Sequence, residues 1–253
     1  MQKLSIVSRF DHYLEQRTLA DSGKVVTVSH NLKNLLDPYE RFSSKFSIIP
    51  NGFDPDEVQI NHLPNSNPEK FIIAYAGRIS PLHFSDNLWS AIEKFYQENE
   101  TFRNKLEIWM IGKFTNEFKT RISRFDFSST IRYTGYLDHK ETMTRLSSAD
   151  LLLLIIANTS DNAGILSSKL FNYLATRKYI LGIGPSTGEA AGILRQTGAG
   201  AMYDYETNLN ELIPQLFRNL ENGIIRQPDE SKIKKYSREN QTKELVRIME
   251  NLT

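Results

Sequence analysis

The chain has 253 residues, with 31 Lys and Arg against 30 Asp and Glu, no Cys, and hydrophobic residues at 40%. This composition is that of a globular protein and excludes a disordered chain or a coiled coil. The net charge of +1 argues against a dedicated nucleic-acid binder. The absence of Cys excludes disulfides, thiolate metal sites and thiol nucleophiles, and the five scattered His predict no metal site.

No stretch of the sequence reads as a membrane span or a secretion signal. The longest apolar run covers residues 151–157, whereas a spanning helix needs about 20 residues. We therefore expect a cytoplasmic protein with no integral membrane segment and no nucleic-acid partner. A basic cluster near the C-terminus leaves open a peripheral contact with the inner face of the membrane, and a solvated helix start is the simpler alternative. The cluster consists of Lys232, Lys234, Lys235 and Arg238.

The first 67 residues predict helices at 10–20 and 31–36 and strands at 25–29 and 45–50. A Pro- and Asn-rich linker follows at 61–70. Two short strands do not make a stable sheet of their own. We therefore expect this segment to be the end of a larger domain.

Strands and helices alternate from residue 71 onward. Apolar runs predict strands at 71–76, 106–111, 131–134, 151–156, 179–183 and 201–203. Helical spacing predicts helices at 85–98, 116–124, 140–147, 168–176, 188–196 and 208–219. This alternation predicts an α/β fold with a Rossmann-like, doubly wound parallel sheet and helices on both faces, over about 68–228. A last helix at 231–252 lies beyond the sheet.

Residues that suit a phosphate follow several of these strands. Ser168 and Lys169 open a helix, whose first N–H groups and positive dipole end attract anions. Arg78, placed after the first strand, lies at the carboxyl edge of the sheet, where doubly wound folds bind ligands. Gly188 and Glu189 belong to a glycine-lined turn after the fifth strand. The alternatives are a serine cap with a surface lysine, a surface salt bridge and a plain chain reversal.

The turn after the fifth strand also leaves a second function open. Gly182, Gly184 and Gly188 form a GxGxxxG pattern, and Asp204 lies 20 residues after Gly184. This loose dinucleotide fingerprint is compatible with an NAD(P)-binding oxidoreductase. However, it does not follow the first strand, and Pro185 removes an N–H that would bind phosphate. A third alternative is a non-catalytic module that binds a nucleotide or a partner.

An ordered set of short motifs resembles the family-four, retaining glycosyltransferases with the two-domain B-type fold. The set comprises VVTVSHN at 25–31, IIPNGFD at 48–54, Gly77-Arg78, Thr134-Gly135-Tyr136, SADL at 148–151, GILSSKLFNYLA at 164–175 and a terminal helix at 236–252. The resemblance implies the end of an N-terminal acceptor domain with its linker (1–67), a donor-binding domain (68–228) and a crossing helix (229–253). Most of the acceptor half is then expected to be missing from this chain.

The resemblance further implies a reaction and its participants. A hexose would pass, with retention, from a UDP- or GDP-sugar to a surface polysaccharide or another glycan. The acceptor would be a glycan or a lipid-linked molecule, and no cofactor would be needed besides the donor.

The resemblance also assigns roles to individual residues. Asp161 and Arg78 are expected to be catalytic. The expected donor-binding residues are Gly77, Arg78, Gly135, Tyr136, Leu137, Ser167, Ser168, Lys169, Asn172, Gly188 and Glu189. Two features depart from the family pattern. Asn172 replaces the glutamate that bonds the ribose, and the lysine after the glycine–arginine pair is absent, with His83 the only nearby candidate.

Overall fold

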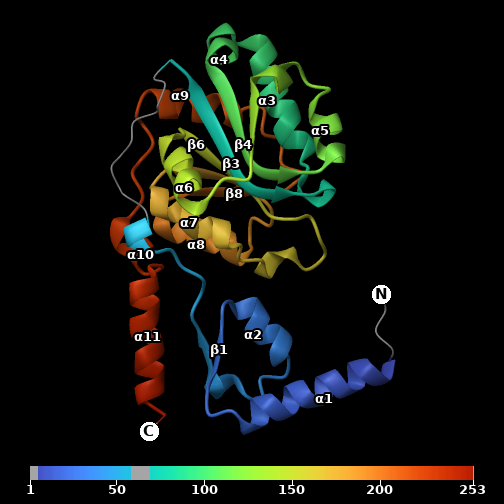
Figure 1. Cartoon of the computed structure of the whole chain (residues 1–253), viewed down its shortest axis with the longest axis vertical. Coiled ribbons are helices and arrows are strands. Elements are labelled where there is room, and N and C mark those ends of the chain that lie inside the picture. Colours follow the sequence, from blue (N-terminus) through green and yellow to red (C-terminus); the bar gives the residue numbers. More distant parts are fainter. Residues whose placement is uncertain (1–4, 58–68, 253) are drawn as a thin grey trace.

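The computed structural model describes residues 5–57 and 69–252 of the chain (Figure 1). An N-terminal segment (residues 5–57) lies beside a larger sheet domain (residues 69–228), and two helices follow at the C-terminus. The predicted boundary between residues 67 and 68, and most of the predicted linker, lie outside the described residues.

The N-terminal segment alternates helices with short strands, in the predicted order. Strands β1 and β2 pair in parallel and form a sheet of their own. The elements are α1 (Ser5–Asp21), β1 (Val25–Thr27), α2 (His30–Leu36) and β2 (Phe46–Ile48), with short 3-10 turns η1 (Ser43–Lys45) and η2 (Pro55–Glu57). Part of its apolar surface faces solvent, since Leu35 is 72% exposed and Phe10 is 59% exposed.

The sheet domain contains six parallel strands, which confirms the predicted doubly wound architecture. They are β3 (Phe71–Ile79), β4 (Leu106–Phe114), β5 (Ile131–Gly135), β6 (Leu151–Ile155), β7 (Tyr179–Ile183) and β8 (Gly200–Tyr203). Their spatial order is β5-β4-β3-β6-β7-β8. The chain therefore starts in the middle, moves out to β5, returns to β6 and moves out to β8. The strand order reverses between β3 and β6, which makes this pair the topological switch point.

Helices cover both faces of this sheet (Figure 1). One face carries α3 (Asp86–Glu98), α4 (Glu100–Lys105), α5 (Asn116–Ile122) and α9 (Leu212–Glu221). The other carries α6 (His139–Ser148), α7 (Ser168–Thr176) and α8 (Glu189–Thr197). Alternate strand residues serve the two cores: Ile73 and Tyr75 of β3 pack on the α3 side, and Ile72 and Ala74 on the α7 side. Each fully buried apolar side chain contributes roughly 1.5–3 kcal/mol to folding.

Local sequence explains where helix α7 begins and ends. Ser167 is its N-cap and accepts a hydrogen bond from the Lys169 N–H at 3.3 Å. Leu170, Phe171 and Leu174 are fully buried on its inner side. The helix ends at Arg177, which adopts a left-handed conformation with φ of 62°.

Several predicted elements need correction, among them α1, which begins at Ser5, and β4, which continues to Phe114. Strand β3 extends through Gly77 and Arg78, which were placed after it, because β4 runs beside it in register as far as Ile79 and Phe114. Helix α9 begins at Leu212, four residues later than predicted. The C-terminal helix is two helices, α10 (Glu230–Lys234) and α11 (Arg238–Glu250).

The break between α10 and α11 has a tertiary cause. Phe53 of the N-terminal segment forms a parallel β-bridge with Ser237, through hydrogen bonds to the Tyr236 carbonyl and the Arg238 N–H. Ser237 also caps α11 by accepting from the Asn240 N–H. Helix α11 then runs away from the sheet domain on the side of the N-terminal segment, where the Gln241 side chain donates to the Pro50 carbonyl (Figure 1).

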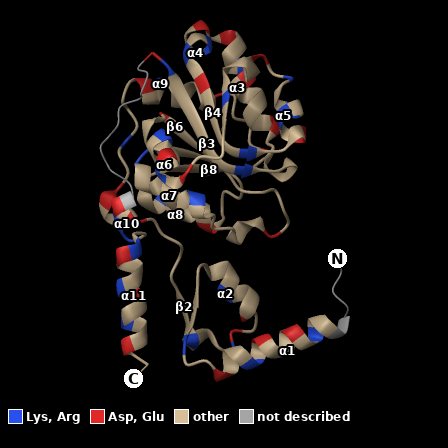
Figure 2. Cartoon of the chain, in the orientation of Figure 1, with Lys and Arg blue, Asp and Glu red and all other residues tan. Residues whose placement is uncertain are grey.

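Figure 2 shows acidic and basic residues interspersed along α1 and α11. Neither helix therefore presents a uniformly apolar surface. Within residues 5–57 and 69–252, no helix combines the length and the apolar character that crossing a membrane requires.

Candidate functional site

The pairing between β3 and β6 stops early, at the switch point. Only Ile73↔Leu151 and Ala74↔Leu152 are in register, although both strands continue toward their carboxyl ends. Beyond these pairs, the hydroxyl of Tyr173 on α7 lies between β3 and β6 and takes the place of the backbone hydrogen bonds that would join them. Its hydroxyl accepts from the Ala76 N–H at 2.8 Å and donates to the Leu153 carbonyl at 3.4 Å. The strands diverge beyond this point, at the edge where open α/β sheets bind ligands.

Lys169 reaches this point from the first turn of α7. Its Nζ donates to the Tyr75 hydroxyl at 2.6 Å and lies 4.6 Å from the centre of the Tyr75 ring. Tyr75 belongs to the core on the α3 side, whereas α7 covers the opposite face. The lysine side chain therefore passes from one face of the sheet toward the other, between the diverging strands.

Gly77 leaves room for this side chain. Its φ of +127° is rarely adopted by residues with a side chain, and a Cβ there would lie 3.0 Å from Lys169 Cδ. Gly112, its register partner on β4, has a φ of +123°, and a Cβ there would meet the Gly77 carbonyl oxygen. Both positions therefore require glycine, and at Gly77 the requirement includes the path of the lysine.

The charges of this group follow from its burial. Burial lowers the pKa of Lys169 to about 8, so the ammonium is charged at neutral pH. Burial, and then the charge of Lys169, lower the pKa of His83, whose Nδ1 lies 3.0 Å from Ser80 Oγ. Burial, and then Tyr173 and Tyr205, raise the pKa of Tyr75, which keeps its proton and donates it to the Arg78 carbonyl at 2.9 Å.

We call Tyr75, Gly77, His83 and Lys169 the switch-point cluster. His83 is neutral in it, so the cation beside the glycine–arginine pair comes from α7 and not from the loop after β3. Arg78 is exposed at the end of β3, and its register partner Lys113 is exposed at the end of β4. Neither side chain makes a hydrogen bond or an ion pair with a described residue. Both cations are free to meet an anion.

The other predicted residues lie at varying distances along the same edge. Ser168 is exposed at the start of α7, and Asn172 is half-buried one turn later, with no bond from its amide to any described side chain or carbonyl. Asp161 is exposed at the N-cap of η5 (Asn162–Gly164). Gly135 is the last residue of β5, which lies two strands away from β3, and Tyr136 and Leu137 follow it; Tyr136 is 81% exposed. The structure thus brings Gly77 and Lys169 into contact.

Glu189, which was expected to bind the donor, makes a contact within the protein. Its carboxylate accepts hydrogen bonds from the backbone N–H groups of His30 and Asn31, at 3.0 and 2.7 Å. These are the first two residues of α2, so Glu189 joins the N-terminal segment to the start of α8. Gly164 packs beside this contact, because a Cβ there would overlap the Asn31 side chain. In this structure Glu189 therefore holds the two parts of the protein together.

The dinucleotide fingerprint is likewise satisfied within the protein. The Asp204 carboxylate accepts from the Ser186 N–H at 2.9 Å and from its hydroxyl at 2.7 Å, and these bonds lower the pKa of Asp204. Asp204, the residue that would bind a ribose in this fingerprint, instead holds the loop that contains Ser186. Gly182 lies within β7 and faces Met202, not a ligand. The geometry gives the oxidoreductase alternative no support.

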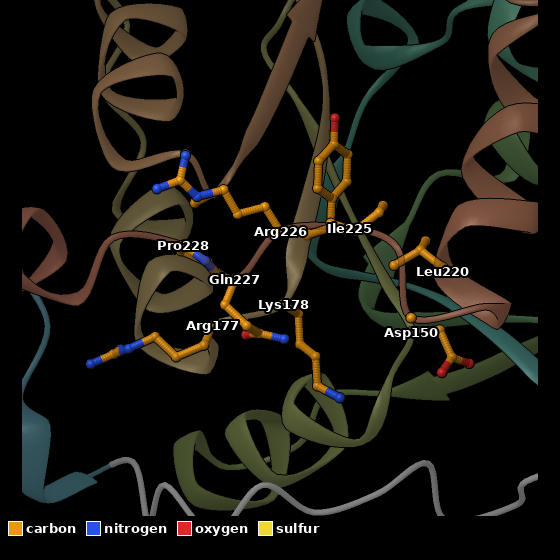
Figure 3. Close-up of a pocket in the computed structure, with 12 residues that line it drawn as sticks. Asp150, Arg177, Lys178, Leu220, Ile225, Arg226, Gln227 and Pro228 are labelled. Carbon is orange, nitrogen blue, oxygen red and sulfur yellow. The ribbon is translucent and has the colours of Figure 1, made fainter.

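A pocket of about 210 Å³ lies at the opposite, amino-terminal edge of the sheet (Figure 3). Asp150 precedes β6 there, and Arg177 and Lys178 precede β7. Arg177 is already engaged with the Glu230 carboxylate and two helix carbonyls. Burial lowers the pKa of Lys178, against the opposing effect of Asp150. This pocket is remote from the switch point, and Lys178 provides a matched control for Lys169.

Sequence reasoning missed three residues of this site. Tyr75 and Tyr173 carry polar hydroxyls inside otherwise apolar stretches, and a buried hydroxyl needs a partner. That signal indicates a bond but does not name the partner. Lys113 follows Gly112 as Arg78 follows Gly77, and this repeated glycine–cation pair at two strand ends was the available sign.

Comparison with known proteins finds similar solved structures but no similar sequence. Neither the protein-family models nor the curated proteins contain a match to the sequence. Among solved structures, HepE of Anabaena in complex with UDP has a TM-score of 0.71 at 12% identity, covering 96% of this chain and 68% of that one. A glycosyltransferase from Rickettsia africae has a TM-score of 0.71 at 18% identity, covering 100% and 68%.

A third structure extends the likeness. WaaG, described as a glycosyltransferase involved in lipopolysaccharide biosynthesis, has a TM-score of 0.63 at 14% identity, covering 96% of this chain and 66% of its own. At such identities the likeness establishes the fold. The chain has the B-type glycosyltransferase fold and spans 66 to 68% of these three proteins.

Proposed function

We propose that this chain binds the donor of a glycosyltransferase that uses a nucleoside diphosphate sugar. The observation that carries the proposal is the Lys169 ammonium at the switch point, beside the N-terminus of α7. A diphosphate matches a buried cation, free helix N–H groups and the exposed Arg78 guanidinium. The Anabaena neighbour was solved with UDP, which supports the same ligand class here.

The residues divide the work of binding and charge stabilisation. Lys169 and Arg78 would stabilise the charge that builds on the leaving diphosphate, which is electrostatic catalysis. The Ser168 hydroxyl and the first N–H groups of α7 would bind phosphate oxygens. Asn172 would bond a ribose hydroxyl through its amide. Asp161 would lie near the transferred sugar, and the turn after β5 would hold the base.

The proposal includes finer assignments as well. A hexose donor with UDP or GDP, transfer with retention, a glycan or lipid-linked acceptor and a cytoplasmic location are part of the proposal. The three neighbours are longer than this chain, and the residues named above are proposed for donor binding alone. Residues 5–57 and α11, which Gln241 bonds to Pro50, would belong to the acceptor side, and Glu189 would join that side to the donor domain.

Calorimetric titration with UDP, GDP, ADP and NADPH tests the proposal. We expect UDP or GDP to bind and NADPH not to bind. Lys169→Ala should abolish tight binding, while Lys178→Ala, at the opposite edge, should leave it unchanged. Binding of NADPH alone would instead favour the oxidoreductase. UDP or GDP binding that is unchanged in Lys169→Ala would refute the proposed site.

A second assay separates an enzyme from a non-catalytic nucleotide-binding module. We expect slow release of nucleoside diphosphate from the matching nucleotide sugar, with water as the acceptor, and loss of that release in Arg78→Ala. Tight nucleotide binding with no release under any condition would support the module.

A further inference from the structure

We infer that Tyr75 is the positioning residue that aims the Lys169 ammonium at the donor diphosphate. This inference rests on the function proposed above. It concerns a residue that makes no contact with the donor in the proposal, and that acts through Lys169.

The hydroxyl of Tyr75 has a fixed orientation. Its ring packs in the α3-side core, with its centre 6.1 Å from that of Phe114. Its proton is committed to the Arg78 carbonyl at 2.9 Å, so an oxygen lone pair faces Lys169. A rigid acceptor of this kind selects one position for the ammonium.

Lys169 needs such a partner. A lysine side chain loses rotamer entropy when it is held in one geometry. The hydrogen bond to Tyr75 at 2.6 Å holds it there before any ligand arrives. Among the described residues, Tyr75 is the only hydrogen-bond acceptor of the ammonium, so two of its three N–H groups remain for phosphate oxygens.

Tyr75 also connects the two cations of the proposed site. Its hydroxyl bonds Lys169 Nζ on one side and the backbone of Arg78 on the other. The Lys169 side chain can reach the Tyr75 hydroxyl because Gly77, beside its path, has no side chain. Loss of the hydroxyl should therefore disturb the diphosphate and leave the nucleoside alone.

The surrounding titratable groups make the effect depend on pH. They are Tyr75 on β3, His83 after it, Tyr173 on α7 and Tyr205 after β8, and all four are uncharged at neutral pH. The charged groups are the Lys169 ammonium and the exposed Arg78 guanidinium at the end of β3. An acceptor bonded to an ammonium favours its charged form. Removing the Tyr75 hydroxyl should therefore lower the pKa of Lys169 further below 8.

The test measures UDP and uridine binding by calorimetry in Tyr75→Phe at pH 6.5 and 8.5. We expect UDP to bind about 5- to 20-fold more weakly at pH 6.5, an effect close to the loss of one ordinary hydrogen bond. The loss should be larger at pH 8.5, and uridine affinity should stay within about twofold. The control is Tyr205→Phe, which loses hydroxyl bonds to the Ile156 and Leu82 carbonyls but does not touch Lys169.

A double-mutant cycle distinguishes the two proposals. In a Lys169→Met background, Tyr75→Phe should have no further effect on UDP binding. If Lys169→Met weakens UDP binding and Tyr75→Phe does not, this inference alone is overturned. It is also overturned if Tyr75→Phe weakens the binding of UDP and of uridine equally. UDP binding that is insensitive to Lys169→Met would overturn the proposed site and this inference together.

The parent protein gives an independent measurement if Tyr75→Phe does not fold. The ¹⁵N signal of the Lys169 ammonium should be resolved and protected from exchange in the free protein at pH 6, as expected for a held group. An ammonium that exchanges as fast as those of surface lysines would overturn the inference.

Discussion

A cation kept from water lowers the stability of a folded protein, and Lys169 is such a cation. Its pKa falls from the ordinary value of 10.5 to about 8 on folding. At 1.36 kcal/mol per unit, this shift corresponds to about 3 kcal/mol as an upper estimate. The hydrogen bond from Lys169 to Tyr75 offsets about 1 kcal/mol of this destabilisation.

The first prediction is that Lys169→Met stabilises the fold while it weakens UDP binding. The free energy of unfolding at pH 7 should rise by about 2 kcal/mol in urea titrations, because the buried charge is removed. The gain should shrink as pH rises from 8 toward 10.5, since the folded parent then loses its charge as well. Lys140→Met, at an exposed position, should change stability by less than about 0.5 kcal/mol. A less stable Lys169→Met protein would contradict this account.

The second prediction concerns the pH dependence of UDP affinity. The cation is fully present below about pH 7 and is lost as pH rises through 8. One proton is therefore taken up per UDP bound at high pH, and affinity should fall about 10-fold between pH 7 and 9. Calorimetry in two buffers of different ionisation enthalpy would detect this proton. A flat profile to pH 9, or the same fall in Lys169→Met, would show that another group titrates.

Sequence reasoning predicted part of this chemistry and missed the rest for a physical reason. Ser168 and Lys169 open a helix after a buried strand, and this local pattern indicates an anion site. The partner of Lys169 is Tyr75, 94 residues away, and only the folded sheet brings them together. Likewise, the sequence predicts that Glu189 belongs to an anion-binding turn. Its contact with α2 could not be predicted, because the two are far apart in the sequence and meet only in the folded chain.

At the scale of elements, α7 has two tasks at the switch point. Its first turn supplies Lys169, and its second presents Tyr173 to both strands of the split ladder. The Tyr173 hydroxyl replaces a strand neighbour for the Ala76 N–H, which would otherwise be buried without a partner.

The third prediction is that Tyr173→Phe destabilises the protein by about 1–3 kcal/mol, the cost of a buried N–H left without an acceptor. Urea unfolding would measure the difference. Tyr96→Phe is the control, since the Tyr96 ring packs near Phe127 and its hydroxyl bonds no described residue. Equal stability of Tyr173→Phe and its parent would mean that the Ala76 N–H finds another acceptor.

Elements were predicted best where local signals agree with the tertiary environment. The bounds of α7 and β7 match the prediction, because a serine cap, an apolar run and a left-handed stop define them locally. Strand β3 was predicted too short, because its neighbour β4 holds Gly77 and Arg78 in the ladder. The C-terminal helix was predicted unbroken, because its interruption comes from Phe53, far away in the sequence.

At the scale of the whole molecule, a few contacts join the N-terminal segment to the rest. Glu189 bonds α2, Gln241 of α11 bonds Pro50, and Phe53 is buried near Arg177. The Glu189 contact lies at the carboxyl edge of the sheet, at the start of α8, whereas Arg177 lies at the amino-terminal edge. The Glu189 contact therefore bears on how the N-terminal segment faces the proposed donor site. The architecture itself could be predicted from alternating apolar runs, whereas this interface could not, because it consists of single polar contacts.

The fourth prediction is that Glu189→Ala frees the start of α2. Two charge-assisted bonds are lost, and each is worth about 1.5 kcal/mol or more. Amide exchange at His30 and Asn31 should accelerate at least about 10-fold, while the sheet domain keeps its protection. Glu117→Ala, at the equivalent first turn of α5, should leave α2 unchanged. Unaltered exchange at His30 in Glu189→Ala would mean that other contacts hold α2.

The most direct test of the central claim is a map of amide chemical shifts on addition of UDP to the ¹⁵N-labelled chain. This account predicts the largest changes at Gly77, Arg78, Ser168 and Lys169, around the divergence of β3 and β6. Amides at the opposite edge, such as that of Lys178, should not move. Changes confined to the opposite edge, or no change at saturating UDP, would contradict donor binding at the switch point.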